Sequence, residues 1–207
     1  MPNYGCLICL AIVASPIFIN QIAVAAIGGS QSPSVAQLVA QPTSELEDAV
    51  FEAVVSDRVD KLKQFLDRGG SPNRYFDAAI NAGSIDCVKL MLARGANINL
   101  PDDEGVTPLM TSVRVTYRNG LEITQLLITK GANINARASR GSTPLMYAAS
   151  GVADHYQDEY VAVVRLLIKH GAKVNVRNKL GDSPLSIAKG GNWQKIVKVL
   201  KHAGAKF

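Results

Sequence analysis

The chain has 207 residues, of which 47% are hydrophobic but only 6% aromatic, so any core that it buries must be mainly aliphatic. Lys and Arg number 22 against 17 Asp and Glu, which gives a net charge of +5. Proteins that wrap nucleic acid carry a much denser positive charge. The composition therefore argues against a nucleic-acid-wrapping protein, a disordered chain and a polytopic membrane protein, and three Cys cannot build a small disulfide scaffold.

The N-terminal part of the chain is uncharged. Residues 1–44 contain no acidic or basic side chain, and residues 5–27 are almost entirely apolar. Ala23-Val24-Ala25 is a small-x-small triplet of the type that signal peptidase accepts, with cleavage before Ala26. The sequence therefore predicts a signal peptide over residues 1–25 and an exported protein, periplasmic or extracellular.

Two other interpretations of this segment stay open. It has no Lys or Arg near its start, so the start codon could be misplaced. It is also long enough to be an uncleaved membrane anchor, although Pro16 and Asn20-Gln21 interrupt it, and the protein would touch a membrane only in that case. Residues 26–44 are rich in Gly, Ser, Pro and Gln and are predicted to be a flexible linker.

The charged remainder of the chain is built from repeats. One phrase closes each unit, and its copies stand at Gly69–Asn73, Gly95–Asn99, Gly131–Asn135, Gly171–Asn175 and Gly204-Ala205. A second phrase opens units, at Thr107-Pro108-Leu109-Met110, Thr143-Pro144-Leu145-Met146 and Ser183-Pro184-Leu185-Ser186. The closing Gly residues are spaced by 26, 36, 40 and 33 residues, and the opening phrases by 36 and 40. The two phrases therefore move in step over the middle units and belong to the same repeat.

Each phrase has a local structural role. Thr or Ser is a typical helix N-cap, and Pro fits the first helical position, where its missing N–H costs nothing. Gly after an apolar run is typical of a helix end in the left-handed conformation. The second helix between the two phrases has its apolar residues at helical spacing: Ile123, Leu126, Leu127; Val163, Val164, Leu166, Leu167; Ile196, Val197, Val199, Leu200. Cys87 aligns with Ile123, Val163 and Ile196 and is predicted to be a buried small hydrophobic residue.

These linked phrases resemble the ankyrin repeat, a unit of about 33 residues with a T-P-L-H-x-A signature. The resemblance covers residues 45–207. It implies an all-α repeat solenoid in which helix-turn-helix units are joined by short β-hairpin fingers. It divides the domain into about five units including caps, at 45–73, 74–99, 100–135, 136–175 and 176–207.

The sequence departs from the family pattern in three ways. Met110, Met146 and Ser186 replace the signature His, so the hydrogen-bond network that this His supports between repeats is expected to be absent. The first two units are too close for a finger between them. The two longer spacings predict insertions between the paired helices, near 115–118 and 152–158.

The sequence contains no recognisable catalytic motif. It has no phosphate-binding glycine loop, zinc-protease helix, nucleophile elbow or Cys-pair metal site. His155 lies among acidic residues in a predicted polar loop, and His170 and His202 lie at helix C-termini, where basic side chains interact with the helix dipole. We therefore predict a protein that is not an enzyme, with no cofactor, no metal and no small-molecule substrate.

The predicted fingers carry a graded charge. The finger at 101–105 is acidic, whereas those at 137–141 and 177–181 are basic. Such charges either solvate the surface or steer a charged partner. An acidic finger beside the basic ones, with no stacking platform for bases, argues against nucleic acid as that partner.

Candidate partner-binding residues lie on the fingers, the first helices and one insertion. Met110 and Met146 could be adaptable contacts or packing between first helices, and the Tyr residues could be interface anchors or could cover the ends of the enlarged helix pairs. The candidates are Asp103, Glu104, Val106, Met110, Arg137, Ser139, Arg140, Met146, Tyr147, Tyr156, Lys179 and Leu180.

The resemblance implies a binding module, because the repeat supplies an extended surface rather than catalytic groups. We expect an exported protein–protein interaction module that holds a partner protein on its finger tips and first-helix face. The alternative is a secreted effector that acts on a host or neighbouring cell. An enzyme with accessory repeats is a third hypothesis, and the repeats leave it no room for a catalytic domain.

Overall fold

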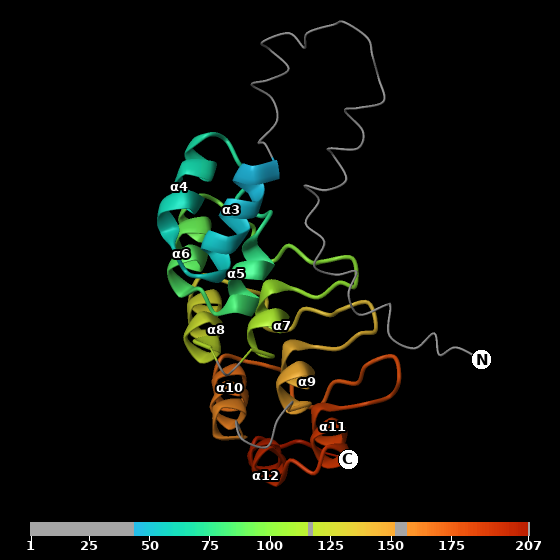
Figure 1. The fold of residues 1–207 in the computed structure, drawn as a ribbon. Helices are drawn as coiled ribbons and strands as arrows, with labels where there is room; N and C mark the ends of the chain where they lie inside the picture. The colour runs from blue at the N-terminus through green and yellow to red at the C-terminus, as the bar shows by residue number, and fades with distance from the viewer. Residues whose placement is uncertain (1–43, 116–117, 152–156, 207) are drawn as a thin grey trace, which may run out of the picture. The chain divides into compact units, whose positions relative to one another are not determined.

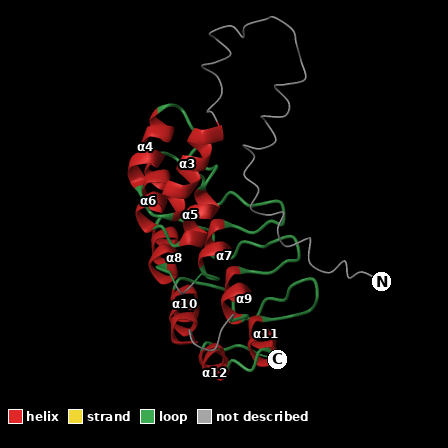
Figure 2. Cartoon of the chain, viewed as in Figure 1, coloured by secondary structure: helices red, strands yellow, loops and turns green. Residues whose placement is uncertain are grey.

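The computed structural model describes residues 44–115, 118–151 and 157–206, and within these ranges it contains ten helices and no strand (Figure 2). The helices are α3 (Ser44–Val55), α4 (Val59–Asp67), α5 (Phe76–Ala82), α6 (Ile85–Ala93), α7 (Pro108–Ser112), α8 (Gly120–Thr129), α9 (Pro144–Ala149), α10 (Gln157–Lys169), α11 (Pro184–Gly190) and α12 (Gln194–His202). None of the helices in these ranges is both long enough and apolar enough to cross a membrane.

The helices form two stacked columns. The first helices α3, α5, α7, α9 and α11 pack on one another, and the second helices α4, α6, α8, α10 and α12 stack beside them (Figure 1). Long loops before α7, α9 and α11 project away from the second helices. The predicted all-α repeat solenoid is therefore confirmed.

The N-caps of the first helices are only partly as predicted. Pro follows Thr107, Thr143 and Ser183 at the start of α7, α9 and α11. The Ser183 hydroxyl accepts a hydrogen bond from the Ser186 N–H (3.1 Å). The buried hydroxyls of Thr107 and Thr143 meet no partner among the described residues, so the predicted side-chain cap is wrong there. The fixed backbone angle of Pro starts these two helices without it.

The residues that replace the signature His bond within their own units. The Ser186 hydroxyl donates to the Ser183 carbonyl (2.9 Å), and the Met110 sulfur lies 3.5 Å from the Thr107 N–H. Ser186 and Met110 therefore stabilise the start of a helix within their own units.

The core is aliphatic and runs through the whole stack. Cys87, Ile123, Val163 and Ile196 occupy equivalent positions, and each is at most 1% exposed, as their alignment predicts. Leu167 is likewise fully enclosed, but Leu126 is only partly buried and packs against the core from its edge. Stacking these side chains removes apolar surface that no single helix pair could bury alone.

The fingers before α7, α9 and α11 share one backbone turn. In the first, the Asp102 N–H donates to the Val106 carbonyl (3.0 Å) and the Gly105 N–H donates to the Asp102 carbonyl (2.9 Å). Equivalent pairs close the fingers at 138–142 and 178–182. Each predicted β-hairpin is thus a closed turn, with no regular strand in the described ranges.

Neighbouring fingers are joined by their backbones and lie side by side (Figure 1). The Ser139 N–H donates to the Glu104 carbonyl (2.8 Å), and the Lys179 N–H donates to the Arg140 carbonyl (2.9 Å). Each bond joins the tip of one finger to the tip of the next. The fingers are therefore held in fixed register.

A second set of links joins the units through the last Asn of each closing phrase. The side-chain oxygen of this Asn accepts a hydrogen bond from a backbone N–H of the following closing phrase. The pairs are Asn73 with Asn97 (2.7 Å), Asn99 with Asn133 (2.8 Å), Asn135 with Lys173 (2.9 Å) and Asn175 with Lys206 (2.7 Å). These bonds satisfy loop N–H groups outside the helices and repeat at every junction in the described domain.

The missing finger falls where the sequence predicts it, whereas the predicted insertions fall largely on 116–117 and 152–156, which are outside the described residues, and Gln157 and Asp158 belong to α10. Residues 68–75 join α4 to α5 without a finger, whereas residues 94–107 include one before α7. The insertions lie between the paired helices, within 113–119 and 150–156, and parts of both are outside the described residues. Their described ends are anchored, because the Tyr160 hydroxyl donates to the Arg114 carbonyl (3.0 Å) and the Trp193 indole N–H donates to the Ser150 carbonyl (2.8 Å).

Leu167→Ala is expected to lower the free energy of unfolding by about 2–5 kcal/mol, because it leaves a cavity in a closely packed aliphatic core. Leu126→Ala, one repeat away and only partly buried, is the matched control and should cost clearly less. Denaturant unfolding followed by circular dichroism measures both. Equal losses in the two variants would contradict the burial difference.

Candidate functional site

The first two fingers and α9 enclose a hollow of about 270 Å³. Asp103 and Glu104 line it from the first finger, Ser139 and Arg140 from the second, and Tyr147 from α9. The bond between the Ser139 N–H and the Glu104 carbonyl fixes the two fingers relative to each other. Five of the predicted contact residues are therefore brought together around one hollow, which we call the finger cleft.

Tyr147 lies half-buried in the finger cleft and has a cationic neighbour. The Arg114 guanidinium is centred 6.0 Å from its ring centroid, within the range of a cation–π contact. Burial raises the pKa of the Tyr147 hydroxyl above its ordinary value, with the charge of Arg114 acting in the opposite direction. The hydroxyl stays protonated at neutral pH and can donate a hydrogen bond to a partner.

The charged residues of the tips divide into two groups. The Asp102 carboxylate accepts the N–H groups of Glu104 (2.9 Å) and Val106 (2.8 Å), so it shapes the turn. The Arg137 guanidinium donates to the carbonyls of Arg177 (3.2 Å) and Gly141 (3.4 Å), so it braces two neighbouring fingers. Arg137, predicted as a contact residue, thus has a structural task as well.

The second group presents its charges to solvent. Asp103 and Glu104 are exposed on the first tip, Arg140 on the second and Lys179 on the third. Leu180 lies beside Lys179 and is 72% exposed, an unusual position for a large apolar side chain. The predicted gradient from an acidic tip to basic tips is therefore present on the aligned fingers.

Three predicted contact residues lie beneath the surface. Met110 is fully enclosed and clusters with Val106 and Ala138, and Met146 is 2% exposed. Of the two interpretations of the Met residues, packing is favoured, because both side chains are buried and Met110 packs against residues of the first two fingers. Val106 and Met110 support the finger cleft from below. Tyr156, the remaining candidate, lies outside the described residues, as does His155.

Asp77 is a titratable residue near the first finger that was not predicted as part of the site. Its Oδ1 atom is buried and has no hydrogen-bond partner within the described part of the chain. Burial is the main cause that raises the pKa of this carboxyl, followed by the charge of Asp102, with Thr111 opposing both. In the sequence, Asp77 could have been recognised because it places a carboxylate in a short first helix, where the other units have apolar or small residues.

Neither metal chemistry nor thiol chemistry is indicated by the described residues. They contain no cluster of three or more His, Cys, Asp or Glu placed to hold a metal ion. Burial, with a smaller effect of the Asp57 charge, raises the pKa of the Cys87 thiol to about 12. The thiol is therefore protonated at neutral pH and unreactive, in keeping with its place in the core.

A family model described as ankyrin repeats (3 copies) matches residues 76–178 and 116–207. The two matches together cover α5 to α12, and the pair α3 and α4 precedes them. No curated protein matches the chain.

Asp77→Asn is expected to raise the melting temperature at pH 7. A carboxyl whose folded pKa is raised stabilises the fold below its ordinary pKa of 3.8, and this contribution is lost as the pH rises through the folded pKa. Because Asn resembles the protonated acid, the gain over the wild type should disappear near pH 3. Thermal melts at the two pH values measure this difference in melting temperature, and Glu52→Gln, at an exposed carboxylate, is the control. An equal gain at both pH values would contradict the raised pKa of Asp77.

Proposed function

Because the chain belongs to the ankyrin-repeat family, we propose that it is an exported interaction module that binds a partner protein on its finger tips and first-helix face, without catalysis. Ankyrin repeats are typical protein-interaction modules, and the repeat fold provides an extended surface for such binding. The observation that carries the proposal is the finger cleft, where carboxylates, a guanidinium and a Tyr from three elements meet.

The chemistry of the finger cleft suits a protein surface of mixed charge. Asp103 and Glu104 can pair with basic side chains of the partner, whereas Arg140 and Lys179 can pair with acidic ones. Tyr147 adds a large, rigid contact with a hydroxyl donor, the type of residue that often dominates binding energy. Opposite charges on fixed fingers also set the orientation in which a partner docks.

The rigidity of the fingers supports a preformed site. Their tips are bonded to one another through backbone groups, so ordering them on binding costs little conformational entropy. The second helices, by contrast, lie on the other side of the stack from the fingers (Figure 1). The described residues 44–115, 118–151 and 157–206 are occupied by helix pairs, fingers and their links, so we assign them no catalytic role.

The uncharged N-terminal segment supports the export part of the proposal. Residues 1–25 act as a signal peptide that delivers the domain to the periplasm or the exterior, and the predicted linker ends at residue 43, because Ser44 already belongs to α3. If the segment is not cleaved, it anchors the domain to the membrane. A secreted effector that binds a host or neighbouring cell is the alternative, and cell fractionation separates the two destinations.

Arg140→Glu combined with Lys179→Glu is expected to reduce partner capture about tenfold, since both charges lie exposed on the tips. The bait is the full chain, and capture from the native envelope fraction is quantified by mass spectrometry. Lys198→Glu with Lys201→Glu, exposed on α12, changes the net charge equally and should leave capture intact.

Two results would overturn the finger assignment. Equal losses in both double variants would mean that capture follows net charge alone. Unchanged capture in the finger variant, together with loss on Tyr156→Ala, would move the binding face to the second insertion. Thermal melts of all variants exclude unfolding as the cause.

N-terminal sequencing of the exported protein is expected to begin at Ala26, because the Ala23-Val24-Ala25 triplet precedes it. Ala23→Leu with Ala25→Leu should block the cut and leave the full-length chain at the membrane. Recovery of an intact N-terminus from the wild type would instead support the anchor, and recovery from the cytosol alone would refute export.

A further inference from the structure

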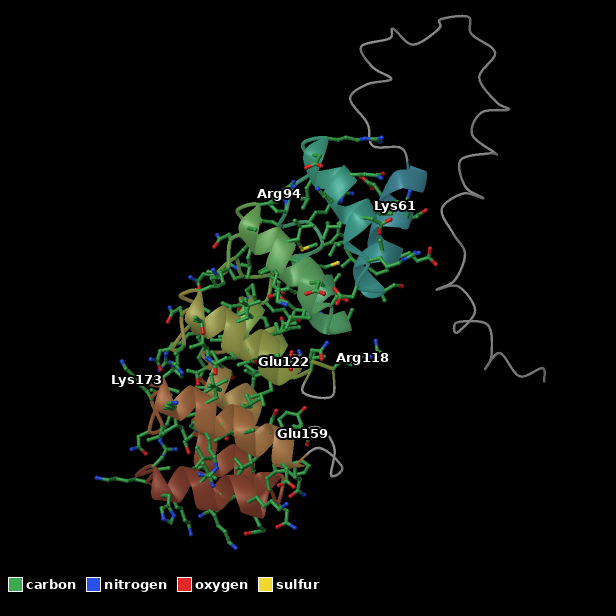
Figure 3. All side chains as sticks on the ribbon, turned by 90° about the vertical axis from the view of Figure 1, so that its left-hand side faces the viewer. Lys61, Arg94, Arg118, Glu122, Glu159 and Lys173 are labelled. Atoms are coloured by element: carbon green, nitrogen blue, oxygen red, sulfur yellow. The ribbon has the colours of Figure 1, made fainter. Side chains whose placement is uncertain are left out.

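A second surface, on the opposite side of the stack from the fingers, has the features of a docking groove. It lies between the second helices α8 and α10 and has a volume of about 610 Å³. Figure 3 looks onto this face and labels Glu122, which lies on the α8 side. We propose that this α8–α10 groove binds an amphipathic helix of a partner protein, with the apolar face of that helix inward and an acidic flank toward α10.

The walls of the α8–α10 groove are mostly apolar. Leu121 lines it from α8, and Ala162 and Leu166 line it from α10. Leu121 is 37% exposed and is one of the large apolar side chains that the described domain leaves open to solvent. Covering these three residues would remove apolar surface from water, which is the main driving force for association.

The two rims of the α8–α10 groove differ in charge, and this difference selects the occupant. Glu122 and Gln125 form the α8 rim, whereas Arg165 and Lys169 form the α10 rim. All four side chains are exposed, and none of the ion pairs among the described residues includes Arg165 or Lys169. The groove therefore has two available cations on one side, which a carboxylate-bearing flank would complement.

The length of the groove fits about two turns of helix. From Ala162 to Lys169 the lining runs along α10 for roughly 11 Å at 1.5 Å per residue. A helix of about two turns presents apolar residues at i, i+3 or i+4, and i+7 along one face, which is the usual pattern for a helix that binds in a groove. The site is formed by two helices and has no sheet edge in the described residues, so an extended strand would find no backbone partners.

The α8–α10 groove is separate from the finger cleft, because the two surfaces share no residue. The finger cleft is lined by residues 103–104, 138–140, Ser142 and Tyr147, whereas the α8–α10 groove is lined by residues of α8 and α10 alone. A partner could therefore engage one surface without the other. Failure of binding at one surface would leave the other proposal standing.

The test uses two fluorescein-labelled peptides designed as 14-residue helices with the same Leu stripe. One has Glu along a single flank and the other has Lys in the same places. Fluorescence anisotropy with the full chain is expected to give binding of the Glu peptide about tenfold tighter than the Lys peptide. Arg165→Glu with Lys169→Glu should invert the preference.

Matched apolar variants test the groove itself. Leu121→Ser should weaken the Glu peptide about tenfold, because it removes an exposed apolar wall, while Leu100→Ser, at a similarly exposed Leu outside both surfaces, should leave binding unchanged. Lys198→Glu on α12, an exposed cation outside both surfaces, is a second control with no expected effect. Thermal melts confirm that each variant stays folded.

Several outcomes would overturn the proposal. Equal affinity for both peptides, with no change when the charges of Arg165 and Lys169 are reversed, would show that the charges of this groove do not determine which peptide binds. Binding to vesicles of 30% phosphatidylglycerol that Leu121→Ser abolishes, with no peptide binding, would assign the face to a membrane. A concentration-dependent dimer in sedimentation velocity that Leu121→Ser dissociates would assign it to a second copy of the chain.

Discussion

The stacking of one helix pair on the next is the interaction on which the rest of this structure depends. A single pair of short helices cannot enclose its own apolar stripe, so each unit is stable only against its neighbours. The equivalent positions Cys87, Ile123, Val163 and Ile196 show the consequence, because the same buried site recurs in successive second helices. The register of the whole domain follows from this repeated contact.

Hydrogen bonds between neighbouring units extend this register to the loops and fingers at the surface. Asn side chains bridge consecutive closing phrases, and backbone bonds join consecutive finger tips. Charges that lie about 36 to 40 residues apart in the sequence are thereby held side by side on adjacent fingers. The finger cleft is a product of this alignment, since its lining comes from two fingers and one helix. The same stacking sets α8 beside α10 and leaves the groove between them.

Much of the fold follows from local sequence signals, and the exceptions have physical causes. Repeat spacing locates the helix pairs, the missing finger and both insertions, because Gly and Pro mark helix ends reliably. It could not decide whether Met110 and Met146 are buried, since α7 and α9 have only five and six residues, less than two helical turns, which is too short for a clear apolar periodicity. Leu126 has the right period but lies at the edge of the apolar stripe.

The candidate site was predicted less completely than the fold. Charged tips and Tyr147 were recognised from composition, but charge alone does not show which side chains are already engaged. Arg137 braces two fingers and Asp102 shapes a turn, and both roles depend on carbonyl and N–H groups whose positions only the folded chain reveals. The Asn links were not predicted for the same reason, although an Asn ends each of the first four closing phrases.

Amide hydrogen exchange at Ser139 and Lys179 tests most directly whether the stacked units hold the fingers in register. Both N–H groups donate to the neighbouring finger, so each should exchange about tenfold or more slowly than the same residue in the unfolded chain. Exchange of both amides at the unfolded rate, with the helices still protected, would show that the fingers are not joined and would contradict the preformed surface.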